Sequence, residues 1–154
     1  MNSNADIKIV DTSQIEKSYK KYDHIQLDSQ YMLSSDGHKC LSSPELFVEE
    51  FFITNNIIHI KEGDINKDSG KRLTEYPFDS DLNSNKRSKE ADWIIMLNEE
   101  SVFVEYFERR MDQKYLDKVD VKRELCDRCG IRLIEMWRKD LTTEKLSVIF
   151  GEWI

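Results

Sequence analysis

The sequence predicts an α/β fold, a mixed-sheet sandwich with the core order αβββαβ that follows a small N-terminal hairpin. Three observations favour it. Residues 44–54 carry a wide apolar helical surface, and residues 91–107 contain two apolar strands around a polar turn. Residues 111–129 have the pattern of a helix, and a strand pattern at 131–137 follows at once, which is typical of a crossover between parallel strands. A final amphipathic helix is expected over 140–150, with Thr142 or Thr143 as its cap.

Length and composition indicate one folded domain. The chain has 154 residues, of which 39% are hydrophobic and 34% charged, within the globular range. Residues 1–30 are polar and are expected to form an N-terminal arm ahead of a domain over 31–154. No apolar run approaches the ~20 residues that a membrane span needs, and the first residues lack the features of a signal peptide. Three cysteines are an odd and small number, so a cytoplasmic location without a membrane is expected.

The formal net charge of −7 argues against a protein that coats nucleic acid generally, because such proteins are basic. It does not exclude a local basic patch. The basic residues are in fact clustered, and each cluster is either a solvated face or part of such a patch. The clusters are Lys17, Lys20 and Lys21; Lys86, Arg87 and Lys89; and Arg109 and Arg110.

The first half of the predicted domain begins with a hairpin over 31–41, whose turn contains Asp36-Gly37. The helix over 44–54 has a serine cap, and Pro44 suits its first position. Glu45 lies in its first turn. This acid either stabilises the helix start, through the helix dipole or a capping box, or points toward a metal site.

A long polar segment over 63–89 separates a predicted strand at 57–61 from the strand that contains Asp92. Connections of this length are uncommon in compact domains and often have a function. Its basic end leads directly into the Asp92 strand, so we expect that end to stand beside any site there.

The two strands of the central hairpin each carry one acid, and an acid in an apolar strand costs free energy unless it is paired or bound to a metal. If the predicted turn over residues 98–101 closes symmetrically, Ile94 opposes Glu105. Since side chains alternate along a strand, Asp92 then shares a face with Glu105 as a diagonal pair, with backbones roughly 7–8 Å apart. The two carboxylates are then able to converge on one divalent cation.

The helix predicted over 111–129 has one polar residue within its apolar stripe. Lys122 falls in that arc and either extends to solvent or lies as a cation against the hairpin carboxylates. The CxxC in this helix lacks the second ligand pair of a zinc site and favours two buried cysteines. The apolar arc consists of Tyr115, Leu116, Val119, Cys126 and Cys129.

The ordered set of elements and acids resembles the PD-(D/E)XK nucleases, and within them the single-domain homing-endonuclease-like and very-short-patch-repair-like branch. The pieces that carry the resemblance cover about residues 31–140. They are Asp36-Gly37-His38, Ser43-Pro44-Glu45, Tyr76-Pro77, Ala91-Asp92-Trp93, Val104-Glu105-Tyr106-Phe107, Tyr115, Lys122 and Gly130-Ile131-Arg132-Leu133-Ile134.

The resemblance implies a restriction-endonuclease-like fold and a Mg²⁺- or Mn²⁺-dependent deoxyribonuclease. It assigns Asp92 and Glu105 as metal ligands, with Glu45 contributing from the first helix. Two departures stand out. Phe107 occupies the place of the motif lysine, for which Lys122 is the candidate replacement, and Glu108 stands where close relatives often have glycine.

DNA is the partner that this resemblance implies. Because cutting both strands of a duplex usually requires two active sites, a homodimer is one expected arrangement. Two alternatives remain at this point: a nucleic-acid-binding module that has lost catalysis, and a protein-interaction subunit with the same fold. The basic residues expected to hold the DNA backbone are Lys86, Arg87, Lys89, Arg109 and Arg110.

Overall fold

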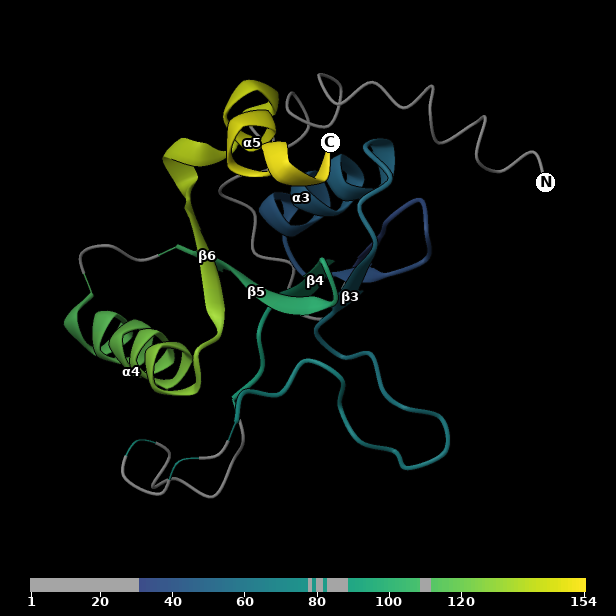
Figure 1. Ribbon diagram of the computed structural model, residues 1–154. Helices are drawn as coiled ribbons and strands as arrows, with labels where there is room; N and C mark the ends of the chain where they lie inside the picture. Colours follow the sequence, from purple (N-terminus) through teal and green to yellow (C-terminus); the bar gives the residue numbers. More distant parts are fainter. Residues whose placement is uncertain (1–30, 78, 80–81, 83–88, 109–111) are drawn as a thin grey trace. The chain divides into compact units, whose positions relative to one another are not determined.

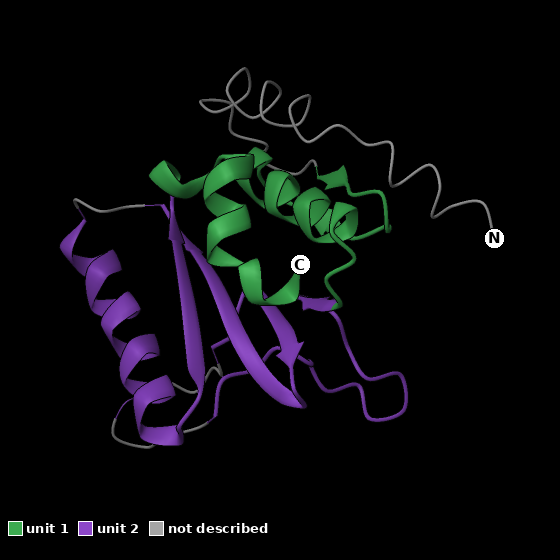
Figure 2. Cartoon of the chain, turned by 45° about the horizontal axis from the view of Figure 1, so that its top comes forward, with its two compact units in different colours: residues 1–58, 138–154 green, residues 59–137 purple. Residues whose placement is uncertain are grey.

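The computed structural model describes residues 31–77, 79, 82, 89–108 and 112–154. The predicted arm over 1–30 lies outside these residues, and so do Lys86, Arg87, Arg109 and Arg110. Figure 1 shows the chain along its sequence, and Figure 2 shows its two compact units. Residues 1–58 and 138–154 form unit 1, and residues 59–137 form unit 2.

Unit 1 contains the predicted hairpin, the first helix and the C-terminal helix. Strands β1 and β2 pair antiparallel around the Asp36-Gly37 turn, in which Gly37 has a φ of 87°. Thr142 caps α5, as predicted. The elements of this unit are β1 (Met32–Leu33), β2 (Lys39–Cys40), α3 (Ser43–Thr54), α5 (Thr143–Ile149) and the 3-10 turns Arg138–Asp140 and Gly151–Trp153.

Helix α3 starts as its sequence predicts. Ser42 is the N-cap, and its Oγ accepts a hydrogen bond from the Glu45 amide at 3.3 Å. The Glu45 carboxylate in turn accepts one from the Leu41 amide at 2.7 Å. These reciprocal bonds satisfy two amides at the start of the helix.

Unit 2 is a four-stranded mixed sheet with one long helix. The strand order is β3-β4-β5-β6; β3, β4 and β5 are antiparallel, and β5 and β6 are parallel. The parallel pair flanks α4, so the predicted crossover is confirmed. These elements are β3 (His59–Lys61), β4 (Trp93–Leu97), β5 (Glu100–Phe107), α4 (Gln113–Cys129) and β6 (Arg132–Trp137).

The turn between β4 and β5 is shorter than predicted. It has two residues, Asn98 and Glu99, with φ values of 50° and 69°, and Leu97 therefore pairs with Glu100. Two successive positive φ angles are the mark of a type I′ turn, whose twist matches that of the strands it joins. The predicted register was thus wrong by two residues. Because a shift of two preserves the face of every side chain, the shared face of Asp92 and Glu105 is unaffected.

One hydrophobic core cluster of unit 2 lies between the sheet and the second half of α4. Leu125 and Cys126 of the helix pack with Ile94 of β4 and Phe103 of β5. Cys126 is buried, as predicted, whereas Cys129 is exposed, contrary to prediction, because it lies beyond this core at the end of the helix. Helix α4 ends at Gly130, which has the left-handed conformation that favours glycine. Along the described residues, no helix has the length and apolar character needed to cross a membrane.

The polar segment before β4 is anchored to unit 2. Its backbone forms isolated bridges between Ile65 and Arg72 and between Glu75 and Glu90. Tyr76 is 3% exposed and packs edge-on against Phe103, with ring centres 4.9 Å apart. This long connection therefore contributes a side chain to the core of the sheet.

Candidate active site

The two acids of the central hairpin lie opposite each other at the end of its ladder. Trp93 pairs with Val104, so the next position brings Asp92 opposite Glu105. The Asp92 amide donates a hydrogen bond to Glu105 Oε1 at 3.0 Å, and the Tyr106 amide donates one to Asp92 Oδ2 at 2.8 Å. Each carboxylate thus accepts from the backbone of the other strand, which fixes the position of both.

Glu105 is 1% exposed, and three segments of unit 2 provide its partners. Besides the Asp92 amide, the Tyr76 hydroxyl donates a hydrogen bond to Oε2 at 3.0 Å, and the Lys122 ammonium forms an ion pair with the same oxygen. A buried carboxylate requires such partners, because its charge is removed from water.

Lys122 reaches the carboxylates from α4. Its ammonium also donates a hydrogen bond to the carbonyl oxygen of Glu90 at 3.1 Å and lies 5.4 Å from the centre of the Tyr76 ring. Its side chain is 20% exposed. Of the two interpretations of this lysine, the structure therefore gives the cation beside the hairpin acids and not the side chain extended into solvent.

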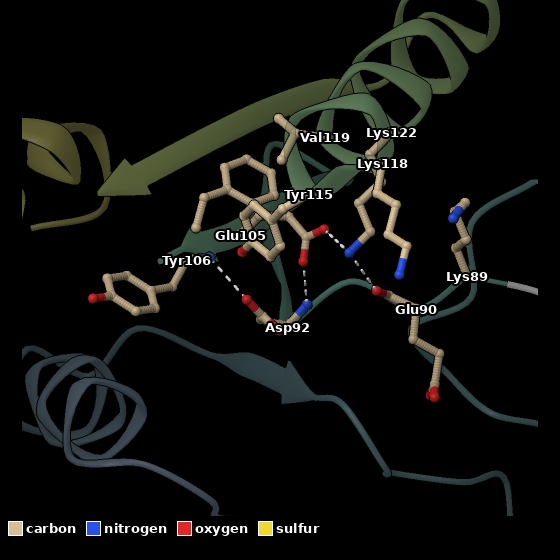
Figure 3. A pocket seen from close by; sticks show the side chains of 10 residues that line it. Lys89, Glu90, Asp92, Glu105, Tyr106, Tyr115, Lys118, Val119 and Lys122 are labelled. Atoms are coloured by element: carbon tan, nitrogen blue, oxygen red, sulfur yellow. Dashed lines mark hydrogen bonds and ion pairs between the residues drawn. The ribbon is translucent and has the colours of Figure 1, made fainter. Parts of the chain in front are cut away.

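These side chains line a pocket of about 290 Å³ (Figure 3). The two hairpin carboxylates lie where β4 begins and β5 ends, and α4 forms the opposite wall of the pocket. All of the pocket belongs to unit 2. It is lined by Lys89, Glu90, Asp92, Glu105, Tyr106, Phe107, Tyr115, Lys118, Val119 and Lys122.

Asp92 is the acid whose charge is least compensated. Burial and the negative charge of Glu105 raise the pKa of the Asp92 carboxyl well above its usual range, although the Tyr106 amide and Lys122 oppose that rise. Perturbed carboxyl groups of this kind are common at functional sites.

The donor atoms of the two acids suit a hard divalent cation. Carboxylate oxygens are the ligands that Mg²⁺ and Mn²⁺ prefer. Lys122 pairs with Glu105, whereas burial and the negative charge of Glu105 raise the pKa of Asp92. A cation held by both acids would supply the positive charge that ionised Asp92 needs, so the residues present fit such an ion.

The position of the motif lysine holds a packed aromatic ring. Phe107 is 3% exposed, and its ring centre lies 6.4 Å from that of Tyr115 and 5.3 Å from that of Trp137. The following residue, Glu108, donates its amide to the Tyr115 hydroxyl at 3.1 Å. The strand after Glu105 is therefore held by the start of α4, and Lys122 of the same helix supplies the cation.

Glu45, the remaining predicted site residue, belongs to unit 1. Its described contacts are those of the helix start, where it accepts the Leu41 amide. Its contribution to the hairpin acids stays a prediction. Of the predicted basic residues, Lys89 lines the pocket; the other four lie outside the described residues.

A second group of charged side chains, in unit 1, had not been predicted. His38 Nδ1 lies 3.0 Å from Asp36 Oδ2 and 3.2 Å from Glu49 Oε1, and Glu49 is fully buried. Hydrogen bonding of the His38 ring to the Asp36 and Glu49 carboxylates raises the pKa of His38 to about 10. These are also residue types that hold metals, and their ligand atoms lie within 4.8 Å of one another. In the described contacts, the His38 ring lies between these two carboxylates and links the β1–β2 hairpin to α3.

Sequence reasoning also missed Tyr76 as a partner of Glu105 and Lys118 as a pocket residue. Tyr76 lies within the polar connection, where no periodicity points to a face. Lys118 could have been predicted, since it stands one helical turn before Lys122.

Comparison with protein-family models, with curated proteins and with solved structures finds no match to this chain.

Proposed function

We propose that the chain is a metal-dependent endonuclease that hydrolyses phosphodiester bonds of DNA, with a restriction-endonuclease-like fold. The observation that supports it is the meeting of Asp92, Glu105 and Lys122 in one pocket. Two acids from adjacent strands and a lysine are the groups that such hydrolysis requires. Their order along the chain is also the one on which the family resemblance rests.

Asp92 and Glu105 are the residues that would hold Mg²⁺ or Mn²⁺. When bound, the ion supplies a water of lowered pKa and a positive charge against the phosphate. The backbone amides of Asp92 and Tyr106 each donate a hydrogen bond to one of these carboxylates and hold it in place.

Lys122 is the residue that we assign to the reacting phosphate. Its ammonium forms an ion pair with Glu105, on the side of the pocket formed by α4. A lysine there donates hydrogen bonds to a phosphate oxygen or orients the attacking water, and either contact stabilises charge that develops in the transition state. Tyr76 and the Glu90 carbonyl hold this lysine and its partner acid in place.

The test is cleavage of supercoiled plasmid and of branched DNA with Mg²⁺, by the wild type and by Asp92→Asn and Glu105→Gln. Both amides keep a carbonyl oxygen for the existing backbone bonds but lose the ligand charge. We expect a loss of at least about 100-fold in rate. Asp117→Asn, an exposed acid elsewhere on α4, is the matched control and should retain activity. Equal rates in all four proteins would contradict the assignment.

Asp92→Asn also has a readout that does not depend on cleavage. Because the folded-state pKa of Asp92 is raised, the folded protein binds a proton that the unfolded chain has released, and the metal-free protein loses stability as pH rises above the unfolded pKa. We expect Asp92→Asn to be more stable than the wild type at pH 8, by about 1 kcal/mol, and to gain little at pH 4. Urea unfolding in EDTA at the two pH values measures this.

A binding module without catalysis is the second candidate, and the packing of Phe107 at the motif position favours it. DNA binding by the wild type in EDTA, together with no cleavage of any substrate with Mg²⁺ or Mn²⁺, would support that candidate. Absence of DNA binding even at low salt would leave the protein-interaction subunit.

A further inference from the structure

Two lysines line the active-site pocket without a part in the acid cluster. Lys118 comes from α4, one turn before Lys122, and Lys89 comes from the end of the polar connection. Figure 3 shows their ammonium groups on the same side of the pocket as that of Lys122. Two separate segments of unit 2 thus bring positive charge to one place.

Within the part of the chain that the structure describes, neither the Lys89 nor the Lys118 ammonium has a hydrogen-bond or ion-pair partner. Lys122 differs, because Glu105 and the Glu90 carbonyl engage it. The nearby Glu90 carboxylate is directed to Arg72, at 2.9 Å.

The lysines also repel one another. Burial lowers the pKa of Lys89, and the positive charges of Lys122 and Lys118 lower it further, whereas the negative charge of Glu105 opposes that shift. Holding like charges together is unfavourable for the folded chain alone, and an anion between them removes that cost.

We propose that Lys89 and Lys118 bind one phosphate group of a polynucleotide, next to the phosphate that Lys122 and the two acids receive. This inference rests on the proposed function for the identity of the polyanion. Lysine ammonium groups are compact point charges and bind phosphate oxygens without demanding one geometry.

The site reads the nucleic-acid backbone and not its sequence. A pocket of about 290 Å³ is at the small end of ligand sites, large enough for a phosphate and its sugar. Contacts to phosphates fix the register of a nucleic acid and carry no direct sequence information. Binding through Lys89 and Lys118 should therefore be similar for strands of different sequence.

The experiment measures binding of a labelled single-stranded thymidine oligonucleotide of about twelve nucleotides by fluorescence anisotropy, in EDTA, over a series of salt concentrations. The proteins are the wild type, Lys89→Gln, Lys118→Gln and the double variant. We expect each single variant to weaken binding about threefold to tenfold. The slope of log affinity against log salt should fall by about 0.7, because each variant neutralises one phosphate fewer.

Lys114→Gln is the matched control, because it removes the same charge from an exposed position of α4 that does not line the pocket. A mixed-sequence oligonucleotide should give the same losses, and circular dichroism checks that each variant is folded. The inference is overturned if the double variant binds as the wild type does, if Lys114→Gln loses as much, or if the wild type does not bind at low salt.

This measurement separates the inference from the proposed function. It requires neither metal nor cleavage, and Asp92→Asn should show the same dependence on Lys89 and Lys118 as the wild type. If cleavage is absent but the lysine variants weaken binding, the phosphate site stands and the nuclease does not. If cleavage is present but the lysine variants bind normally, only the phosphate site fails.

Discussion

Glu105 and Asp92 share one pocket but have different surroundings. Glu105 receives a hydroxyl, an ammonium and a backbone amide, whereas Asp92 receives the Tyr106 amide and the repulsion of Glu105. Lys122 therefore acts as an internal counter-ion for one acid. A divalent ion entering the site has to compete with that ammonium for Glu105.

Removal of this counter-ion should separate metal binding from catalysis. In Lys122→Met, the acids keep their positions but lose the competing charge, so we expect Mn²⁺ to bind about threefold to tenfold more tightly. Cleavage should be lost. Titration calorimetry with Mn²⁺ measures the affinity, with Lys114→Met as the control for a general loss of charge. Unchanged or weaker Mn²⁺ binding would show that Lys122 does not occupy the ion's place.

The Tyr76 hydroxyl should stabilise the fold through Glu105 alone. Tyr76→Phe keeps the ring that packs on Phe103 and removes one donor from a buried carboxylate, so we expect a loss of about 1–3 kcal/mol in the free energy of unfolding. Tyr31→Phe, at a half-exposed ring, should change it little. Urea unfolding compares them, and equal effects of the two variants would contradict this role.

Single residues show which contacts of the candidate site could be predicted from the sequence. The alternation of side chains placed Asp92 and Glu105 on one face, and the helical periodicity of α4 pointed to Lys122. Tyr76 was out of reach, since its partner is 29 positions away and the segment between them has no repeating pattern. The contact depends on how a long connection folds back, which local rules do not specify.

At the level of elements, the turn between β4 and β5 decides the register of the whole hairpin. A symmetric four-residue turn was predicted from the polar run at 98–101, but Glu100 and Ser101 belong to the strand. Polarity alone did not reveal this, because both of their side chains are exposed within the strand. The shared face of the acids survived because the error was an even number of residues.

The same turn offers a stabilising substitution. Glu99 has a φ of 69°, a conformation that costs a non-glycine residue about 1 kcal/mol. Glu99→Gly creates the Asn-Gly pair that type I′ turns favour, so we expect a gain of about 0.5–1 kcal/mol. Thermal unfolding measures it. Glu100→Gly, one residue later in the strand, should instead destabilise the protein, and a gain there would argue against the two-residue turn.

Considering the whole molecule, unit 1 is built from two stretches of chain that the sheet of unit 2 separates in sequence. Phe150 joins them: its ring centre lies 6.0 Å from that of Phe51 and 5.0 Å from that of Phe52. The sequence indicated both helices, from the serine and threonine caps and the apolar positions. It did not indicate that they pack together, because that contact spans almost a hundred residues.

Loss of this aromatic packing should destabilise unit 1. Phe150 is fully buried, so we expect Phe150→Ala to cost about 3–5 kcal/mol. Val148→Ala, two residues earlier and 82% exposed, should change the stability by less than about 0.5 kcal/mol. Urea unfolding followed by tryptophan fluorescence compares the two. A small effect of Phe150→Ala would show that α5 contributes little to the packing of α3.

Because unit 1 consists of two separate stretches of sequence, its two parts are synthesised at different times. Residues 59–137 leave the exit tunnel before residues 138–154, so every strand and the long helix of the sheet unit are available while Phe51 and Phe52 still lack Phe150. Domains generally fold as units as they emerge. The pocket with Asp92, Glu105 and Lys122 can therefore form during translation, whereas helix α3 gains its aromatic contacts with Phe150 only after that residue has emerged.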